Sequence, residues 1–274
     1  MASRAAVIGA GPMGLWLTKY LKARGYGVVV YDRNRSRARA AANALKTDMA
    51  KTLDEAVGEA ELTVLAVGAE NAGPLLSGLL KRYSGKVYVD ISSVKAPILK
   101  FLPRQTPSSQ VVLIHPLFGP GAKTLKDKVV VVTPVYRRQA EVSIAKKLFN
   151  PCKIVSMNPR EHDVLMAYAM AAPRVAVFSV LELWRKHRIK PLTTSQKALL
   201  AAASTMLADS WKITGQIVAQ NPYTKKALGE LINKIKQNQE NIHRMPTATH
   251  QRLASWIRPK KFYGKVYKII EENP

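Results

Sequence analysis

The segment that most constrains the fold is RAAVIGAGPMG, in which three glycines follow a run of small and β-branched residues. The run predicts a short β-strand, and the apolar residues after Pro12 predict a helix that ends near Gly25. Placed between a strand and a helix, a G-x-G-x-x-G pattern lets the backbone approach a pyrophosphate, and the helix N-terminus supplies free N–H groups. A glycine turn without a ligand is the alternative. The residues predicted to hold the cofactor here are Gly9, Gly11, Pro12, Met13 and Gly14.

The second predicted strand, YGVVVYD, ends at Asp32. An acidic residue about 20 residues beyond the glycine turn is where a carboxylate accepts the ribose hydroxyls of NAD. Arg33 follows at once, and an arginine at this place can hold the extra phosphate of NADP. Because the carboxylate would repel that phosphate, we favour NAD and keep NADP as the alternative. Asp32 and Arg33 are both predicted cofactor contacts.

Predicted strands and helices alternate as far as residue 157. Further strands are predicted at residues 61–67, 85–93, 110–115, 127–134 and 152–157, and helices at residues 35–45, 71–83 and 136–149. This order predicts a doubly wound α/β domain of Rossmann type, with a mainly parallel sheet, over residues 1–157. Ligands of such sheets bind beyond the carboxyl ends of the strands, where we expect Asp32, Ser92, Ser93 and His115.

Strand signals nearly vanish after residue 157. Helical patterns are predicted at residues 160–187, interrupted by Pro173, and at residues 195–220, 224–245 and 247–257. We therefore expect an all-helical second domain over residues 158–274, which would hold the substrate-binding and dimerisation surfaces. Its alanine-rich apolar faces favour a homodimer, and a monomeric bundle is the alternative.

The net charge of +25, from 43 Lys and Arg against 18 Asp and Glu, suits an anionic small-molecule substrate. The densest basic groups match no nucleic-acid-binding signature, so a nucleic-acid partner is not favoured. No apolar stretch reaches the ~18 residues of a membrane span, so no membrane association is expected. Cys152 is the single cysteine, which excludes a disulfide within the chain and favours a cytoplasmic protein. No residues have metal-ligand spacing, and no metal is predicted.

Three further segments, taken with the glycine turn, resemble the prephenate dehydrogenase family, which includes the related arogenate dehydrogenases. DISSVK (residues 90–95) is similar to the family's segment after the fourth strand, and HPLFGP (residues 115–120) is close to its histidine-proline signature. PREHD (residues 159–163) resembles the segment that opens the family's helical domain. The resemblance implies NAD(P)-dependent oxidative decarboxylation of prephenate or arogenate, to 4-hydroxyphenylpyruvate or tyrosine, in tyrosine biosynthesis.

The same resemblance implies roles for individual residues. His115 is expected to accept the proton of the substrate's C4 hydroxyl as hydride leaves, for which an imidazole with a pKa of ~6.5 is suited. A strand-end histidine bonded to backbone is the alternative. Ser93 is expected to bond the same hydroxyl or the imidazole, and Ser92 to contact the cofactor. Lys95 is expected to serve the loop, the phosphates or the substrate, and His162 to have a capping or structural role.

The chain departs from the family in its second half. The residues flanking Pro173 include Ala171 and Arg174, where the family carries histidine, and Gln216 stands where the family has an arginine that binds a substrate carboxylate. We therefore expect Arg174 to bind that carboxylate from a different position, and Gln216, which can form hydrogen bonds but not balance charge, to contact the substrate. Two alternatives remain. One is another dehydrogenase of the superfamily, acting on a hydroxy acid or an imine. Such enzymes commonly use a lysine that follows a glycine-rich segment of the helical domain, and no such segment precedes Lys197 or Lys212. The other is a non-catalytic nucleotide-binding protein.

Overall fold

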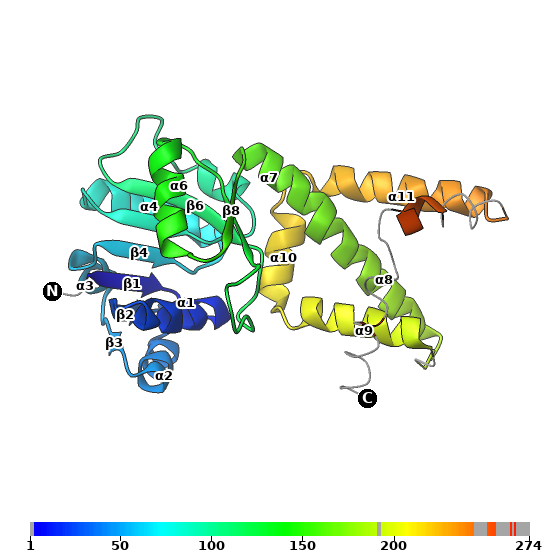
Figure 1. Ribbon diagram of the computed structural model, residues 1–274, viewed down its shortest axis with the longest axis horizontal. Coiled ribbons are helices and arrows are strands. Elements are labelled where there is room, and N and C mark those ends of the chain that lie inside the picture. Colours follow the sequence, from blue (N-terminus) through cyan, green and yellow to red (C-terminus); the bar gives the residue numbers. More distant parts are fainter. Residues whose placement is uncertain (1–2, 191–192, 244–250, 256–263, 265, 267–274) are drawn as a thin grey trace. The chain divides into compact units, whose positions relative to one another are not determined.

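The computed structural model describes residues 3–190, 193–243, 251–255, 264 and 266 (Figure 1). The chain divides into two compact units, Met1–Asp163 and Val164–Pro274. The first unit contains the β-sheet, and the second is built from helices (Figure 1). The first unit extends past the boundary expected at residue 157 and takes in the opening residues of the helix that follows.

The described part of the first unit forms an eight-stranded sheet in the order β3-β2-β1-β4-β5-β6-β7-β8. β6 and β7 are antiparallel, and the other neighbouring strands are parallel. This confirms the predicted doubly wound, mainly parallel α/β fold. The strand order reverses between β1 and β4, which is where open sheets of this kind bind ligands. The strands are β1 (Arg4–Ile8), β2 (Gly27–Tyr31), β3 (Asp48–Met49), β4 (Leu62–Leu65), β5 (Val87–Asp90), β6 (Gln110–Pro116), β7 (Val129–Val132) and β8 (Lys153–Ser156).

Helices cover both faces of the sheet, because successive side chains of a strand point to opposite faces. Ala5 and Val7 of β1 belong to one buried cluster, with residues of α1 and α6. Ala6 and Ile8 belong to the other, with residues of α3, α4 and α5. Ala41 of α2 packs separately against β2. These helices are α1 (Pro12–Ala23), α2 (Arg35–Leu45), α3 (Leu53–Gly58), α4 (Ala69–Arg82), α5 (Ala96–Leu99) and α6 (Arg138–Leu148).

The segment between α2 and β4 contains two elements that the sequence does not predict. β3 has two residues, too few to show the alternation of a strand. α3 has six residues and starts at a cap, where the Thr52 hydroxyl accepts a hydrogen bond from the backbone N–H of Glu55. Both are short connections, and they leave the order of the main strands as predicted.

The second unit begins inside a continuous helix (green in Figure 1). α7 (Pro159–Met166) passes through a π-helical turn, η1 (Ala167–Ala171), into α8 (Ala172–Lys186). In this turn the backbone N–H of Ala172 donates to the carbonyl of Ala167. Pro173 has no N–H to donate, and its ring would crowd the preceding turn of an ordinary α-helix. The wider turn accommodates the proline, so the helix continues where the sequence predicts an interruption.

The single helix predicted over residues 195–220 is two helices, which is a correction. α9 (Thr194–Leu207) and α10 (Trp211–Ala219) are separated at Ser210, whose hydroxyl accepts the backbone N–H of Ile213 and so caps α10. α10 and α11 (Thr224–Glu240) both pack against η1. The fourth predicted helix, over residues 247–257, lies mostly outside the described residues, of which 251–255 are helical.

The helix Pro159–Lys186 also corrects an expectation about composition. Its most apolar stretch has a mean hydropathy of 1.8, so by length and composition it is able to cross a membrane. Other described helices do not meet this test. A helix from the apolar interior or interface of a helical bundle meets it equally well. The finding is therefore weak evidence for a membrane.

Candidate functional site

Each glycine of the turn between β1 and α1 has its own structural reason. Gly9 has φ +109°, and a Cβ there would lie 2.4 Å from the carbonyl oxygen of Ala66. A Cβ at Gly14 would lie 1.8 Å from the carbonyl oxygen of Gly9. A Cβ at Gly11 would meet no described atom within 4 Å, so the backbone there borders open space. No side chain caps the start of α1. The turn therefore combines close internal packing with an open side, as a pyrophosphate site requires.

Asp32 follows β2 and is joined to the glycine turn. Its Oδ2 accepts the backbone N–H of Ala10 at 2.8 Å, and its Oδ1 accepts that of Asn34 at 2.8 Å. The guanidinium of Arg37 lies 3.9 Å from Oδ2, whereas Arg33 is exposed. The carboxylate is thus held at the carboxyl edge of the sheet beside the turn. Arg37, which like Arg33 follows the second strand closely in the sequence, is the arginine whose positive charge lies near this carboxylate.

The loop after β6 is anchored on α1. Phe118 packs edge-on against Trp16, with ring centroids 5.2 Å apart, and the indole Nε1–H of Trp16 donates to the carbonyl of Ala122 at 2.9 Å. Pro116 is itself paired with β7 as the last residue of β6. These contacts explain the composition of HPLFGPGA, whose prolines and aromatic ring fix the chain just beyond His115.

A buried ion pair lies behind the ends of β5 and β6. The ammonium of Lys95 donates to Asp90 Oδ2 at 2.7 Å and to the carbonyl of Ile114 at 2.6 Å, and both charged side chains are fully buried. Ser92 Oγ donates to the same Asp90 oxygen at 2.7 Å. Burial lowers the pKa of Lys95, and the charge of Asp90 opposes that effect. The pair ties the loop after β5 to the strand that carries His115.

His115 is held by a second histidine. Its Nδ1 lies 3.0 Å from Nε2 of His162, and Nδ1 of His162 lies 2.8 Å from Oδ1 of Asp163. Asp163 also accepts the backbone N–H groups of Lys95, at 2.9 and 3.1 Å, and of Ala96, at 2.7 Å. Both rings and the carboxylate are buried. The other ring nitrogen of His115, Nε2, has no hydrogen-bond partner among the described residues.

The surroundings keep both imidazoles neutral near neutral pH. Desolvation lowers the pKa of His115 well below its usual 6.5, and His162 and the ammonium of Lys95 lower it further. Desolvation also lowers the pKa of His162, and the hydrogen bond that its ring donates to Asp163 opposes this effect by raising the pKa. A neutral imidazole has one lone pair for accepting a proton, so His115 has the chemistry of a general base.

This burial predicts a loss of stability in mild acid. Because the unfolded histidines take up protons near pH 6.5 and the folded ones do so only at lower pH, the free energy of unfolding should decrease as pH falls below 6.5. The slope contributed by each histidine is at most about 1.4 kcal/mol per pH unit. Urea denaturation at a series of pH values measures it. His115→Asn should have a shallower slope, and an unchanged slope would show that His115 titrates normally in the folded protein.

The structure brings several predicted site residues to one edge of the sheet. The glycine turn, Asp32, Ser92 and His115 all lie at the carboxyl ends of parallel strands. His115 stands three strands from the turn in the order β1-β4-β5-β6, roughly 14 Å at the usual strand spacing. Ser93 is half-buried and forms no side-chain hydrogen bond with described residues.

Two predicted contacts are engaged inside the protein instead. The Ser92 hydroxyl is bonded to Asp90 and to the carbonyl of Val94, and the Lys95 ammonium has no exposed surface. Their assignments to cofactor and substrate stay predictions, and this geometry favours an internal role for both. Sequence reasoning assigned His162 a structural role and did not select Asp163. The available signal was the pair of adjacent polar residues in PREHD, where an acid follows a histidine.

Arg174 and Gln216 lie in the second unit. Arg174 is buried on α8 and its Nη2 donates to Asp209 Oδ2 at 2.5 Å. Its Nε is buried and has no partner among the described residues. Gln216 is half-buried on α10 and has polar interactions of its own. The charge of Arg174 is therefore balanced within the protein by Asp209, although one of its donors remains for a ligand or a water molecule.

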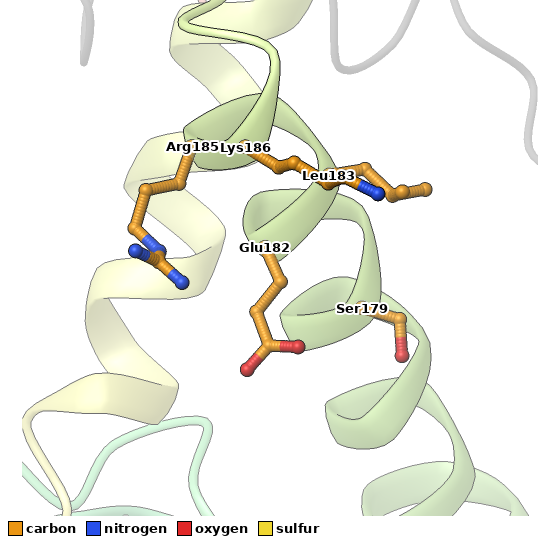
Figure 2. A pocket seen from close by; sticks show the side chains of 5 residues that line it. All are labelled: Ser179, Glu182, Leu183, Arg185 and Lys186. Atoms are coloured by element: carbon orange, nitrogen blue, oxygen red, sulfur yellow. The ribbon is translucent and has the colours of Figure 1, made fainter.

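A hollow of about 530 Å³ lies on α8. Figure 2 shows that its lining side chains leave one helix in different directions, and they do not converge on a common point. The lining residues are Ser179, Glu182, Leu183, Arg185 and Lys186. All five come from the single helix α8, and the structure gives the hollow no feature that points to catalysis. No group of three metal-ligating side chains occurs in the part of the chain that the structure describes.

The sequence matches a known family model over residues 17–158, just over half of the chain; the model is described as "Prephenate dehydrogenase, nucleotide-binding domain". A curated protein of Methanocaldococcus jannaschii, described as "Probable arogenate/prephenate dehydrogenase", is 23% identical over 241 residues. The matched region is 85% of this chain and 53% of that protein. The chain thus spans about half the length of this curated relative.

The fold is similar to those of solved dehydrogenases. Prephenate dehydrogenase from A. aeolicus, in complex with hydroxyphenyl propionate and NAD+, has a TM-score of 0.73 at 16% identity, over 97% of this chain and 98% of that one. Synechocystis arogenate dehydrogenase has a TM-score of 0.61 at 18% identity, over 97% of this chain and 99% of that one. At these identities the likeness is one of fold.

Proposed function

The chain belongs to the prephenate dehydrogenase family, and on this premise we propose that it catalyses the NAD-dependent oxidative decarboxylation of prephenate or arogenate. The products are 4-hydroxyphenylpyruvate and tyrosine, respectively, in tyrosine biosynthesis. The observation that carries the proposal is His115: it is buried at the same sheet edge as the glycine turn, with Nδ1 held by His162. Its Nε2 has no partner among the described residues, which leaves one nitrogen for the substrate.

The residues around the glycine turn fit NAD. The open side of Gly11 and the uncapped start of α1 suit the pyrophosphate, and Asp32 suits the adenosine ribose hydroxyls. When bound, NAD accepts the hydride that leaves C4 of the substrate. NADP is the alternative, because Arg33 and Arg37 are near the same place.

His115 handles the proton of the reaction. Its Nε2 accepts the proton of the C4 hydroxyl as the carbon loses hydride and the carbonyl forms. Loss of the ring carboxylate as carbon dioxide then places its bonding electrons in the ring, and the imidazolium returns the proton to the C4 oxygen. Ser93 is the residue proposed to bond the hydroxyl or the imidazole, and its side chain has no competing hydrogen bond with described residues. The same imidazole therefore takes up the proton and later returns it.

The carboxylates of the substrate require hydrogen-bond partners. Arg174 and Gln216 are the candidates on the second unit, and the unpartnered Nε of Arg174 is the group that supports this assignment. Asp209 already balances the charge of Arg174. Arg174 and Gln216 would therefore bind a carboxylate through hydrogen bonding more than through net charge.

The predicted homodimer is supported by exposed apolar side chains on the second unit. They include Leu183, Leu207, Trp211, Ile232 and Ile235. Exposed apolar side chains mark association surfaces where they gather into a patch. A cytoplasmic location, expected from the single cysteine, stays a prediction.

The function is tested by mixing the purified protein with NAD and either prephenate or arogenate, and following NADH absorbance. Turnover with one substrate supports the proposal and identifies which of the two it is. Turnover only with a hydroxy acid or an imine would favour another dehydrogenase of the superfamily. NAD binding without any turnover would favour a non-catalytic nucleotide-binding protein.

Asp32 provides a prediction about cofactor choice. Asp32→Ala should weaken NAD binding about 10- to 100-fold, the effect of losing one charged hydrogen bond of roughly 1.5–3 kcal/mol. NADP should lose less, because its 2′-phosphate also loses a repelling neighbour. Calorimetric titration with each cofactor measures both affinities. Asp32→Asn is the matched control, because it keeps an acceptor for the backbone N–H of Ala10. A wild-type preference for NADP would contradict the assignment of NAD.

A further inference from the structure

We propose that His162 and Asp163 are positioning residues that hold His115 in one tautomer, with its proton on Nδ1 and its lone pair on Nε2. This proposal rests on the proposed function, since it says how the base of that reaction is prepared. A neutral imidazole can carry its proton on either nitrogen, and only the tautomer with a bare Nε2 is able to accept a proton at that atom.

Asp163 determines which nitrogen of His162 carries the proton. Three N–H groups converge on its carboxylate: the backbone N–H of Lys95, the backbone N–H of Ala96 and Nδ1 of His162. The two backbone groups can only donate, so the carboxylate is an acceptor toward them. An ionised carboxylate has no proton to give. Nδ1 of His162 must therefore carry the proton of its hydrogen bond with Asp163.

The neutrality of the two rings then determines which nitrogen of His115 carries the proton. Since His162 is neutral with its proton on Nδ1, its Nε2 is a lone pair and can only accept. The 3.0 Å contact with His115 then requires Nδ1 of His115 to donate. His115 is neutral as well, so its Nε2 is bare. One carboxylate, through one intervening ring, determines which nitrogen of His115 can act as a base.

The charged groups packed around the two rings are consistent with this order. The ammonium of Lys95, from the loop after β5, disfavours a positive charge on either ring, and Asp90 neutralises that ammonium. Asp163, on α7, is the anion that directly faces His162. The backbone of Lys95 in turn fixes Asp163. The same lysine thus keeps the rings neutral through its side chain and orients the carboxylate through its main chain.

The tautomer can be measured directly by ¹⁵N NMR of the imidazole nitrogens, in the protein without substrate. The chain has five histidines, and His115→Asn and His162→Gln assign the two signals. At neutral pH we expect His115 and His162 both to be protonated on Nδ1 and bare on Nε2. A wild-type His115 protonated on Nε2 would overturn the proposal. Because this readout needs no turnover, it separates failure of the proposal from failure of the proposed function.

Asp163→Asn should invert the order. The amide oxygen of asparagine would be drawn to the two backbone N–H groups, which leaves its NH₂ to donate to Nδ1 of His162. His162 would then carry its proton on Nε2 and donate to Nδ1 of His115, whose own proton would move to Nε2. We expect the NMR signals to report this exchange and kcat to fall, by up to about 10⁴-fold, the loss known for an Asp→Asn change that imposes the wrong tautomer in serine proteases.

Two substitutions of His162 separate positioning from mere packing. His162→Phe preserves a ring but has no acceptor, and we expect kcat to fall about 10- to 100-fold, as for other supporting residues behind a reactive group. His162→Gln offers an amide oxygen to Nδ1 of His115 and should recover most of that loss. KM for NAD should be unchanged in both, and His187→Phe, at an exposed histidine, is the control for added aromatic surface. Equal kcat in the Phe and Gln variants, with both folded, would contradict the proposal.

Discussion

His115→Asn is expected to lower turnover by about 10²–10⁴-fold, the contribution usual for a general acid–base group. Asparagine cannot accept the proton of the substrate hydroxyl near neutral pH. Its NH₂ group can occupy the place of Nδ1 and still donate to His162, so the buried arrangement around Asp163 should survive. Steady-state kinetics with NAD in excess measures the effect on kcat.

Two controls make this result interpretable. The affinity for NAD should match that of the wild type, since His115 lies three strands from the glycine turn. At a pH well above 6.5 the free energy of unfolding should also change little, because both the native and the replacement side chain are neutral there. Turnover equal to that of the wild type in a folded variant would remove His115 from the mechanism.

The predictable part of this site is the part that backbone geometry dictates. Gly9 needs a positive φ and Gly14 needs close contact with the Gly9 carbonyl, so only glycine fits, and the sequence reveals the turn. The buried strands show themselves in the same way, because each must fill two opposite clusters with apolar side chains. Asp32 follows from its place after the second strand.

The less predictable part depends on side-chain direction. Ser92 and Ser93 are adjacent in sequence, yet one hydroxyl is bonded to Asp90 and the other is left without such a bond among described residues. The position of Lys95 after β5 does not reveal that its side chain points inward and pairs with the buried carboxylate of Asp90. His162 is distant from His115 in sequence, and only the folded chain brings their rings together. Proximity of this kind leaves no periodic signal.

The break at Ser210 and the continuous helix through Pro173 both differ from the sequence prediction, and for the same physical reason. The helical pattern rich in small residues runs across residues 208–210, but the hydroxyl of Ser210 caps a new helix there. Proline usually ends a helix, but the wider π-turn at Ala167–Ala171 removes the clash. In both cases a local hydrogen-bond choice overrides the longer-range pattern.

Lys95→Met is expected to be the most destabilising single substitution proposed here, costing about 3–5 kcal/mol of unfolding free energy. The variant would leave the carboxylate of Asp90 fully buried without its cation, and the carbonyl of Ile114 without a donor. Urea denaturation compares it with the wild type. Lys81→Met, at an exposed lysine, is the matched control and should change stability by no more than about 0.5 kcal/mol.

The double variant Asp90→Asn, Lys95→Met tests whether the cost comes from the uncompensated charge. Asparagine is neutral and similar in size, and it keeps an acceptor for Ser92, so the double variant should be more stable than Lys95→Met alone. A coupling free energy of about 1–3 kcal/mol is expected for groups in direct contact. Additive costs would mean instead that Lys95 stabilises the fold through the packing of its methylene groups. In that event His115 would owe its position to close packing behind β6 more than to the buried ion pair.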